Sequence, residues 1–526
     1  MGIANEQTGG DMQQLAQRIN NSLIGVSADL TRLTQISATT DDDELLATPG
    51  ECEYIISPYD VFRKLERINI RKAPGPDNLP NWFLRDFAFT LAEPLSCIFN
   101  TSVSEGVVPS IWKRANIVAI PKTKPARVIE QDLRPISLTP TISKVFESLV
   151  GRWILGSIGD KFDKKQFGAI KGRSTSHALL DMTHRWHRAL DERQSVRVAF
   201  LDYAKAFDHV DHPTVMRKLA VLGLPPILLR WHHSFLLNRE QRVKIGDVMS
   251  DWASANGGMP QGTWLGVYVY LSLINDLTST LDLHKFVDDC TLTEILPNAT
   301  STMQQRLDEF NSWSVDNYMI VNTKKTKEML LGPVKTTSLQ NLQLDGQQIE
   351  RVTTFKLLGL IVNNALKWND HVSAICTKAS KRLHFLKLLK RAAMSTDELL
   401  HYYQTVIRPV LEYACVVWHS SLTTGQTAQL ESIQRRAVKI IHHNDKNLVS
   451  QTLDQLSSLA DRRDELCRLF FKKLIHPNSC LHELLPEKRN CDVTMKLRHA
   501  NKFIIPRTRT ERFKKSAVIH ALNNYL

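Results

Sequence analysis

The sequence lacks any long apolar segment. A membrane-spanning helix needs about 18 consecutive apolar residues, and the most apolar stretch, Trp264 to Ile274, is shorter and contains glycine and serine. The first residues, Met1 to Gln14, are polar and form neither a secretory signal nor a myristoylation pattern. These absences predict a protein of the nucleus or the cytoplasm that is not secreted and has no membrane partner.

Cysteine is scarce and irregularly placed. Eight cysteines occur among 526 residues, and the Cys and His residues between Cys467 and Cys491 match no common zinc-binding spacing. We therefore expect reduced, mostly buried thiols. The sequence also has no Gly-Lys-Thr/Ser phosphate loop and no Gly-x-Ser-x-Gly turn, which argues against a P-loop nucleotidase and a serine hydrolase.

Acidic residues are outnumbered by basic ones, and the formal net charge is +13. This balance favours a polyanionic partner, with nucleic acid ahead of an anionic membrane surface. The segment from Lys496 to Lys515 has eight Lys and Arg residues against one acid. We expect it to contact nucleic acid through Arg507, Arg509 and Arg512, with a nuclear-import signal as the alternative.

Two acidic stretches carry the strongest chemical signal. Asp288 and Asp289 lie inside the short apolar run His284 to Leu292, although aspartate is a poor strand former. Val196 to Asp202 alternates like a strand and also ends on an acid. An Asp-Asp pair alone is more often an ordinary polar turn. Two strand-borne carboxylates that converge, however, can hold two Mg²⁺ ions, which activate a hydroxyl and neutralise a departing pyrophosphate.

Three further stretches fit chemistry on a nucleotide. Phe207 follows the first acid by five residues, as a core residue or as a wall against a sugar. The turn Gly257 to Thr263 allows close backbone approach to a ligand, and its Gln261 can donate and accept hydrogen bonds. Lys325 lies in a lysine cluster that can protonate a pyrophosphate or can be a solvated charge run.

The remaining pattern predicts alternating helices and strands, with one helix that starts at Ser57-Pro58 and another from Pro80 to Asn100. The Gly-rich, basic stretch Gln166 to Thr175 suits a phosphate backbone. Ile111 to Pro121 and Leu133 to Leu138 are expected to form a basic hairpin, and Phe355 to Val362 a single strand. Residues 1–55 are interpreted as a leader without a clear fold.

Taken in order, the motifs resemble the reverse transcriptase of non-LTR (LINE-type) retrotransposons, nearest the jockey-like branch. The blocks that carry the resemblance are Lys72-Ala73-Pro74-Gly75-Pro76-Asp77, Leu133-Arg134-Pro135-Ile136-Ser137-Leu138, Gln166-Phe167-Gly168, Lys171-Gly172-Arg173-Ser174-Thr175, Phe200-Leu201-Asp202, Lys205-Ala206-Phe207-Asp208, Met259-Pro260-Gln261-Gly262-Thr263, Leu265-Gly266, Ile274-Asn275-Asp276-Leu277, Phe286-Val287-Asp288-Asp289, Val321-Asn322, Lys325-Thr326-Lys327 and Leu358-Gly359. They cover about residues 55 to 365.

The resemblance implies an α+β right-hand polymerase fold. Fingers and an antiparallel-sheet palm would occupy residues 56–345, a helical thumb 346–445, and a helical basic C-terminal region 446–526. The implied activity is RNA-directed DNA synthesis from dNTPs, with an RNA template and a DNA primer or target as partners.

The resemblance also assigns roles to single residues. Asp202 and Asp288 would bind two catalytic Mg²⁺ ions, for which Mn²⁺ can substitute, and Asp289 would assist them. Phe207 would exclude the ribose 2′-hydroxyl and so select dNTPs. The other implied contacts are the backbone carbonyl of Tyr203 to a metal, Arg134 and Lys122 to the triphosphate, Gln261 and Gly262 in the nucleotide pocket, Lys325 as general acid, and Lys171, Arg173 and Lys381 to nucleic acid.

The sequence departs from the family pattern at several points. Val287 replaces the usual alanine before the acid pair, Ala169-Ile170 replaces an aromatic-Arg pair, and Val267 replaces a proline. Residues 1–55 are too few for the endonuclease domain that autonomous elements carry, so a separate endonuclease acting in trans is expected. The departures keep open a catalytically inactive or co-opted RNA-binding protein. An RNA-copying RNA polymerase is the third reading, and Phe207 argues against it.

Overall fold

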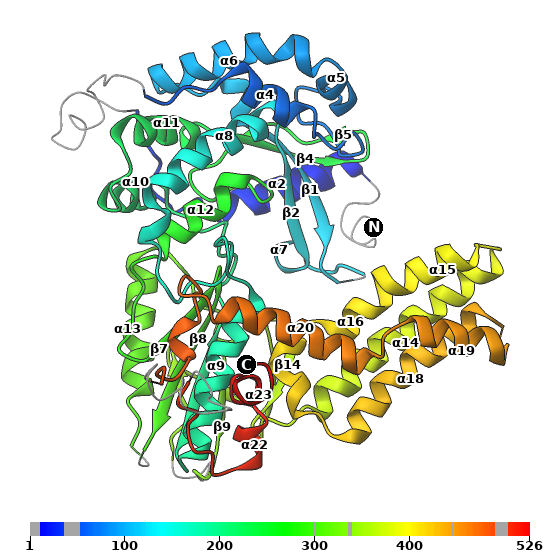
Figure 1. Ribbon diagram of the computed structural model, residues 1–526. Helices are drawn as coiled ribbons and strands as arrows, with labels where there is room; N and C mark the ends of the chain where they lie inside the picture. The colour runs from blue at the N-terminus through cyan, green and yellow to red at the C-terminus, as the bar shows by residue number, and fades with distance from the viewer. Residues whose placement is uncertain are drawn as a thin grey trace. The chain divides into compact units, whose positions relative to one another are not determined.

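The computed structural model describes residues 11–35, 53–123, 125–297, 300–334, 339–443, 445–489 and 503–526 (Figure 1). It is a mixed helix and sheet protein that divides into two compact units. Unit 1 comprises Met1–Asp163, Tyr203–Thr278 and Glu309–Val321, and unit 2 comprises Lys164–Asp202, Ser279–Asp308 and Asn322–Leu526. The chain crosses between the units several times, so the units do not coincide with the contiguous segments expected from the sequence.

Unit 1 contains a sheet with the order β2-β1-β4-β5, in which β6 also pairs with β4. The predicted basic hairpin is present, because β1 and β2 pair antiparallel with Ile120 opposite Arg134. β1 also pairs in parallel with β4. The strands are β1 (Arg114–Pro121), β2 (Leu133–Leu138), β4 (Glu240–Ile245), β5 (Val248–Met249) and β6 (Ala253–Ser254).

The N-terminal helix α2 (Met12–Gly25) belongs to the core of unit 1. Asp11 caps it by accepting hydrogen bonds from the backbone of the first turn. Leu15 and Ile19 are buried in a cluster with residues of β1 and β4, such as Val243. The interpretation of residues 1–55 as a leader without a fold is therefore corrected for this helix, because its apolar stripe covers a sheet. Residues 36–52 lie outside the described residues.

Helices cover the rest of unit 1. The helix start expected at Ser57 is present, with Pro58 as the first residue of α4. The single helix expected from Pro80 to Asn100 is two helices, because Phe87 leaves the helical conformation between them. The helices are α4 (Pro58–Leu65), α5 (Asn81–Asp86), α6 (Ala88–Glu105), α7 (Ile129–Asp132), α8 (Thr141–Ile158), α10 (His212–Val221), α11 (Pro226–Leu236) and α12 (Trp264–Leu273), with α13 (Met303–Asp316) beginning in unit 2.

Unit 2 is built on a sheet with the order β12-β9-β3-β8-β7. β3 lies between two antiparallel neighbours, and every residue of it is buried, including Arg197. The carboxylate of Glu328 lies 2.7 Å from Arg197 and 3.0 Å from Arg351, which compensates for burying charge in this sheet. The strands are β3 (Ser195–Leu201), β7 (Asp282–Phe286), β8 (Asp289–Leu296), β9 (Lys327–Leu331) and β12 (Glu350–Arg351).

The single strand expected at Phe355 to Val362 is instead a hairpin of β13 (Thr354–Leu357) and β14 (Leu360–Asn363). Leu358 and Gly359 both adopt positive φ angles, 45° and 87°, as a type I′ turn requires. The apolar run concealed this Leu-Gly turn, because leucine rarely adopts such a φ. The short strand pair β10 (Gln343–Leu344) and β11 (Gln347–Gln348) completes the sheets.

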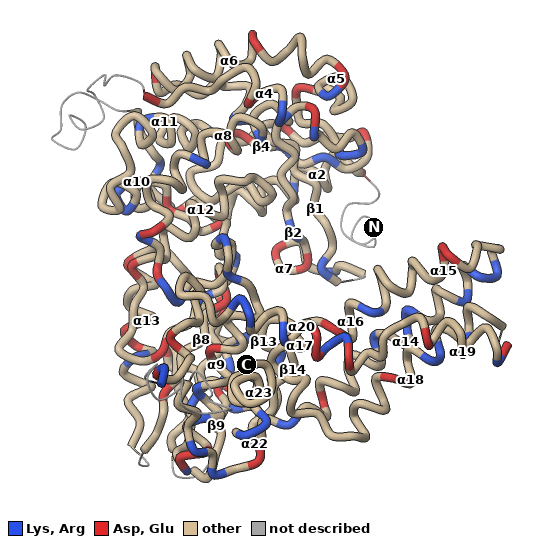
Figure 2. Tube along the Cα trace, viewed as in Figure 1, with Lys and Arg blue, Asp and Glu red and all other residues tan. Residues whose placement is uncertain are grey.

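The rest of unit 2 is helical. α14 and α18 lie side by side (Figure 1). Several Lys and Arg residues occur along α14, whereas those of α18 are confined to its second half (Figure 2). No helix in the described part of the chain has the length and apolar character for crossing a membrane. The helices are α9 (Thr175–Asp191), α14 (Asn369–Arg391), α15 (Thr396–Tyr402), α16 (Arg408–Glu412), α17 (Cys415–Trp418), α18 (Thr424–Ile441), α19 (Lys446–Gln455), α20 (Leu459–Leu474), α22 (Glu511–Lys514) and α23 (Ala517–Asn524).

Candidate active site

The acid pair lies at the tip of a hairpin in unit 2. β7 and β8 are joined by a two-residue turn, Val287-Asp288, and Asp289 is the first residue of β8. Val287 has a φ of 58°. A β-branched residue rarely adopts this left-handed conformation, and glycine is preferred at such turn positions. The hairpin tip that carries the acids is therefore locally strained.

The segment Gln166-Phe167-Gly168 holds this turn in place. The buried Gln166 side chain accepts hydrogen bonds through Oε1 from the backbone N–H groups of Gly168, at 2.8 Å, and of Val287, at 3.0 Å. The Phe167 N–H donates to the Lys285 carbonyl at 2.8 Å. A Cβ atom on Gly168 would lie 2.6 Å from Val287 Cγ2, so only glycine fits there. The sequence predicted a phosphate loop here, whereas the first three residues support the acid turn.

Asp202 follows the end of β3, beside the strand that begins with Asp289. The antiparallel register pairs Leu201 of β3 with Cys290 of β8, so the residues that come next at this end of the two strands are Asp202 and Asp289. The Lys325 ammonium lies 3.1 Å from Asp202 Oδ2. Asp202, Asp289 and Lys325 line one pocket of about 400 Å³, together with Lys324, Lys327 and Lys356. Unit 2 thus brings two of the three predicted carboxylates and the predicted general acid into one pocket.

The electrostatics of Asp289 reflect this crowding. Desolvation by the surrounding protein, followed by the negative charges of Asp288 and Asp202, raises the pKa of Asp289 to about 6, and Lys325 opposes the shift. A divalent cation would relieve the same repulsion, and carboxylate oxygens suit Mg²⁺. Within the described ranges, no three Asp, Glu, His or Cys side chains converge as a preformed metal site. The donor chemistry therefore fits a divalent ion, while Asp202 is paired with a lysine.

In unit 1, the predicted gate residue is bonded to the glycine-rich turn. The half-buried Phe207 ring stacks on Tyr270, with ring centres 4.9 Å apart. The Phe207 carbonyl accepts a hydrogen bond from the Met259 N–H at 2.8 Å. Gln261 Nε2 donates to Asp208 Oδ1 at 3.2 Å. Burial raises the pKa of Asp208, and the hydrogen bond from Gln261 opposes this rise.

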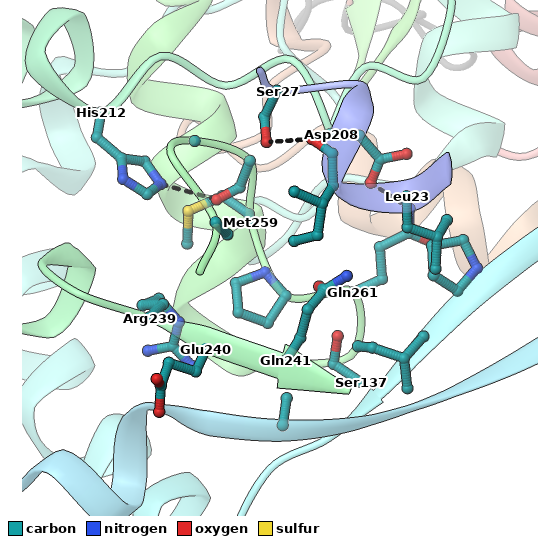
Figure 3. Close-up of a pocket in the computed structure, with 18 residues that line it drawn as sticks. Leu23, Ser27, Ser137, Asp208, His212, Arg239, Glu240, Gln241, Met259 and Gln261 are labelled. Atoms are coloured by element: carbon teal, nitrogen blue, oxygen red, sulfur yellow. Dashed lines mark hydrogen bonds between the residues drawn. The ribbon is translucent and has the colours of Figure 1, made fainter. Parts of the chain in front are cut away.

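Further hydrogen bonds fasten the same turn. The Gly258 N–H donates to the Val210 carbonyl at 2.8 Å. The His212 ring approaches the Gly258 carbonyl, also at 2.8 Å, and Figure 3 shows this bond as a dashed line at His212. Burial lowers the pKa of His212 to about 4, so the ring is neutral near pH 7 and its Nε2–H is the donor. The Gln261 carbonyl accepts from the Ser137 N–H of β2 at 2.9 Å. Several backbone contacts therefore determine the position of Gln261 within unit 1.

The other predicted nucleotide contacts differ in availability. Arg134 is exposed on β2. The Lys122 ammonium donates to the Gln131 carbonyl at 3.0 Å, so it is engaged locally. The Tyr203 side chain is buried, and its hydroxyl lies 3.0 Å from Ser314 Oγ. Gly262 is exposed with a φ of 109°, a conformation that glycine tolerates best.

The predicted nucleic-acid contacts also divide into two kinds. Arg173 Nη1 donates to the Gln166 carbonyl at 2.6 Å, so this guanidinium braces the acid-turn support. Arg512 Nη1 donates to the Ala365 carbonyl at 3.0 Å, and the Arg509 backbone N–H bonds to Asp191. The exposed predicted residues are Lys171, Lys381, Arg507, Arg509 and Arg512. Residues 496–502 of the predicted basic segment lie outside the described residues.

Two residues that sequence reasoning missed as site elements are Gln166 and Asp208. Both occur in motifs that the sequence singled out, but neither motif shows which side chain bonds to which turn. The only sequence signal for these two residues is their position: Asp208 directly follows the gate residue Phe207, and Gln166 directly precedes Phe167-Gly168.

Residues 120–362 match the family model described as "Reverse transcriptase (RNA-dependent DNA polymerase)". The chain is 25% identical over 469 residues to the RNA-directed DNA polymerase from mobile element jockey of Drosophila melanogaster, covering 84% of this chain and 50% of that protein. It is 24% identical over 468 residues to the Drosophila funebris protein of the same name, with the same coverage of both chains. It is 25% identical over 455 residues to the probable RNA-directed DNA polymerase from transposon X-element of D. melanogaster, covering 83% and 49%.

The chain spans about half the length of these relatives. Among solved structures, a telomerase from Candida tropicalis in complex with a fragment of telomeric RNA aligns with a TM-score of 0.37 and 12% identity, over 69% of this chain and 59% of that chain. The sequence resemblance to jockey-like elements is confirmed by the family match together with the named relatives.

Proposed function

Because residues 120–362 form a reverse transcriptase domain related to those of jockey-like mobile elements, we propose that the chain is the RNA-directed DNA polymerase of a non-LTR retrotransposon. It would transfer nucleotides from dNTPs to a primer 3′-hydroxyl on an RNA template. The observation that carries the proposal is the placement of Asp202 and Asp289 at adjacent strand ends in a lysine-rich pocket.

We further propose that Asp202, Asp288 and Asp289 hold two Mg²⁺ ions. Such ions activate a hydroxyl and stabilise the charge on pyrophosphate when bound. The raised pKa of Asp289 fits this role, since a cation would favour its ionised form. Lys325 lies close enough to the carboxylates to exchange its ion pair with Asp202 for a contact to the leaving group. Its ammonium can then donate a proton to pyrophosphate.

In unit 1, the proposed roles concern the incoming nucleotide. Phe207 would exclude a 2′-hydroxyl, because its ring is held by Tyr270 and cannot easily turn away. Gln261 would contact the nucleotide. Asp208 sets the orientation of the Gln261 amide, because an ionised carboxylate accepts hydrogen bonds and does not donate them, so the amide Nε2 must face it. Arg134 is exposed for a triphosphate contact. The proposed fold is a right hand whose helices α14, α15 and α18 form the thumb.

Primer extension on an RNA template, with Mg²⁺ and dNTPs, tests the function. Wild-type protein should extend the primer, and Asp202→Asn should reduce the rate at least about 10³-fold, because one metal-binding carboxylate is lost. Asp247→Asn, an exposed acid in the β4–β5 turn, is the matched control and should extend normally. Incorporation of rNTPs as readily as dNTPs would contradict the gate role of Phe207. A folded, RNA-binding wild type that extends nothing would contradict the polymerase assignment.

A further inference from the structure

Unit 1 contains a second basic concavity, here called the α4–α8 pocket. It has a volume of about 640 Å³ and lies between α4, the loop before α5, and α8. Six cationic side chains line it and only one carboxylate, that of Asp60, does so. The cations are Arg63, Lys64, Arg67, Lys72, Lys144 and Arg152.

The floor of the pocket is rigidly built. Asn81 is buried and donates through Nδ2 to the carbonyls of Asn69, at 3.2 Å, and of Lys72, at 3.0 Å. Its Oδ1 accepts from Thr141 Oγ1 at 2.7 Å. One amide thus ties the loop carrying Lys72 to the start of α8, which carries Lys144. The two lysines therefore belong to a preorganised site.

The positive charge of the pocket is largely uncompensated. Arg152 lies 3.5 Å from Asp60, and Arg63 lies 3.9 Å from Glu66, both in exposed pairs. Across the described part of the chain, Lys64, Arg67, Lys72 and Lys144 form no ion pair within 4.0 Å. Burial, followed by the charges of Arg152 and Arg67, lowers the pKa of Lys64. Burial lowers the pKa of Lys144; the negative charge of Glu147 opposes this shift, and the positive charge of Lys72 adds to it. Bound anions would relieve this repulsion.

Exposed aromatic residues adjoin the pocket. Tyr59 is 66% exposed, and the Arg63 guanidinium lies 5.9 Å from its ring centre. Trp82 follows the floor residue Asn81 and is 52% exposed. Tyr59 belongs to α4 and Trp82 to α5. Figure 2 shows the basic and acidic residues of these two helices.

We propose that the α4–α8 pocket binds phosphates of a single-stranded RNA segment whose bases stack on the adjacent aromatic side chains. Single-stranded nucleic acid is recognised by a basic groove combined with stacking platforms, because every base has a face that can stack. A duplex hides its base faces and would leave Tyr59 and Trp82 without bases to stack on. The site goes beyond the proposed polymerase activity, since holding RNA there requires no catalysis.

The test is binding of a labelled, unstructured RNA to the full chain, measured by fluorescence anisotropy without dNTPs. The variant Lys72→Gln/Lys144→Gln should bind about tenfold more weakly, and its salt dependence (log K against log salt) should flatten by about 1.4, for two phosphate contacts on a single strand. The control Lys244→Gln/Arg32→Gln removes the same charge elsewhere in unit 1 and should leave affinity within about twofold.

A second variant separates stacking from charge. Trp82→Ala should weaken RNA binding about five- to tenfold with an unchanged salt slope, because a stacked base is lost but no phosphate contact. Ile111→Ala, a similarly exposed apolar residue elsewhere in unit 1, is its control and should have no effect. Lys72 and Trp82 are exposed and Lys144 is half-buried, and an unchanged thermal midpoint would show that the variants fold.

Three outcomes would overturn the proposal. In the first, the variants bind RNA as tightly as their controls. In the second, the variants lose affinity for duplex RNA but not for the single strand. In the third, they lose affinity only for anionic phospholipid vesicles. The assay also separates this proposal from the preceding one. Extension of a short pre-annealed template–primer should be unaffected by Lys72→Gln/Lys144→Gln, and a wild type unable to extend would leave the RNA-binding result standing.

Discussion

The two turns that carry the proposed chemistry are held in different ways. The turn of Val287 and Asp288 in unit 2 has a β-branched residue at a φ of 58° and depends on the side chain of Gln166. The turn of Gln261 in unit 1 uses glycines where φ is positive, and it is fastened by several backbone hydrogen bonds. One turn is strained and rests on the buried Gln166 side chain, whereas the other is relaxed and is held by several backbone hydrogen bonds.

This difference predicts unequal sensitivity to mutation. A strained conformation persists only when its surroundings enforce it. Removing the support of the acid turn should therefore disturb both stability and activity. Removing one contact of the Gln261 turn should leave the fold intact and alter only how that amide meets its ligand.

The largest expected effect is that of Gly168→Ala. The new Cβ would lie 2.6 Å from Val287 Cγ2 and 2.7 Å from its backbone nitrogen, so the acid turn must move. We expect a loss of about 3 kcal/mol in the free energy of unfolding, as for other overpacked sites, and loss of primer extension. Denaturant titration and the extension assay measure these effects.

The control for that change is Gly156→Ala on α8, where a Cβ meets nothing within 4 Å. It should be neutral or stabilise the protein by about 0.5–1 kcal/mol, as alanine does in helices. Equal behaviour of the two variants would show that Gly168 is not closely packed against the turn.

Gln166→Ala removes the support without adding bulk. The N–H groups of Val287 and Gly168 lose their acceptor, which costs about 2 kcal/mol in the free energy of unfolding. The turn is then free to relax, so kcat for extension should fall about tenfold or more. Gln348→Ala, an exposed glutamine of the same unit, serves as control. A change in stability without any change in kcat would show that Gln166 does not position the acids for catalysis.

Asp208→Asn tests the other turn and should have a smaller effect. Asparagine can present either a donor or an acceptor to Gln261, so the amide orientation is no longer determined. We expect the KM for dNTP to rise about three- to tenfold, an effect of about 1 kcal/mol, while kcat and stability stay within about twofold of wild type. Steady-state extension kinetics decide between this result and a general loss of kcat.

The smallest effect concerns the protonation of Asp289. Its pKa is about 6 in the folded chain against an ordinary 3.8, so between these values the folded state binds more protons than the unfolded state. Stability contributed by this group therefore falls as pH rises from about 4 to 6. Asp289→Asn should stabilise the protein at pH 7.5 by about 0.5 kcal/mol, a value discounted because the side chain is exposed. The difference should vanish near pH 4.

Much of this architecture is predictable from local patterns. The hairpin of β1 and β2, the helix beginning at Pro58 and the strand ending at Asp202 follow from alternation, capping and proline placement. The resemblance to jockey-like reverse transcriptases followed from ordered motifs, and the family match over residues 120–362 and the named relatives confirm this resemblance. Roles of individual site residues remain predictions.

Other features were hidden by the same local patterns. α2 looked like part of a leader because nothing in its sequence shows that β1 and β4 need its apolar stripe. The strand expected at Phe355 to Val362 turned back at Leu358, because the pairing of β13 with β14 outweighs the poor fit of leucine to a positive φ.

The sequence by itself determined the residue types and the order of the chemistry, since carboxylates, glycines and an aromatic gate are set by composition and spacing. Only the tertiary structure decided which groups support them. Gln166 reaches Val287 across 121 positions of sequence, and Gln261 reaches Asp208 across 53. Such contacts arise when separate strands and turns pack together, and local periodicity carries no information about partners so far apart.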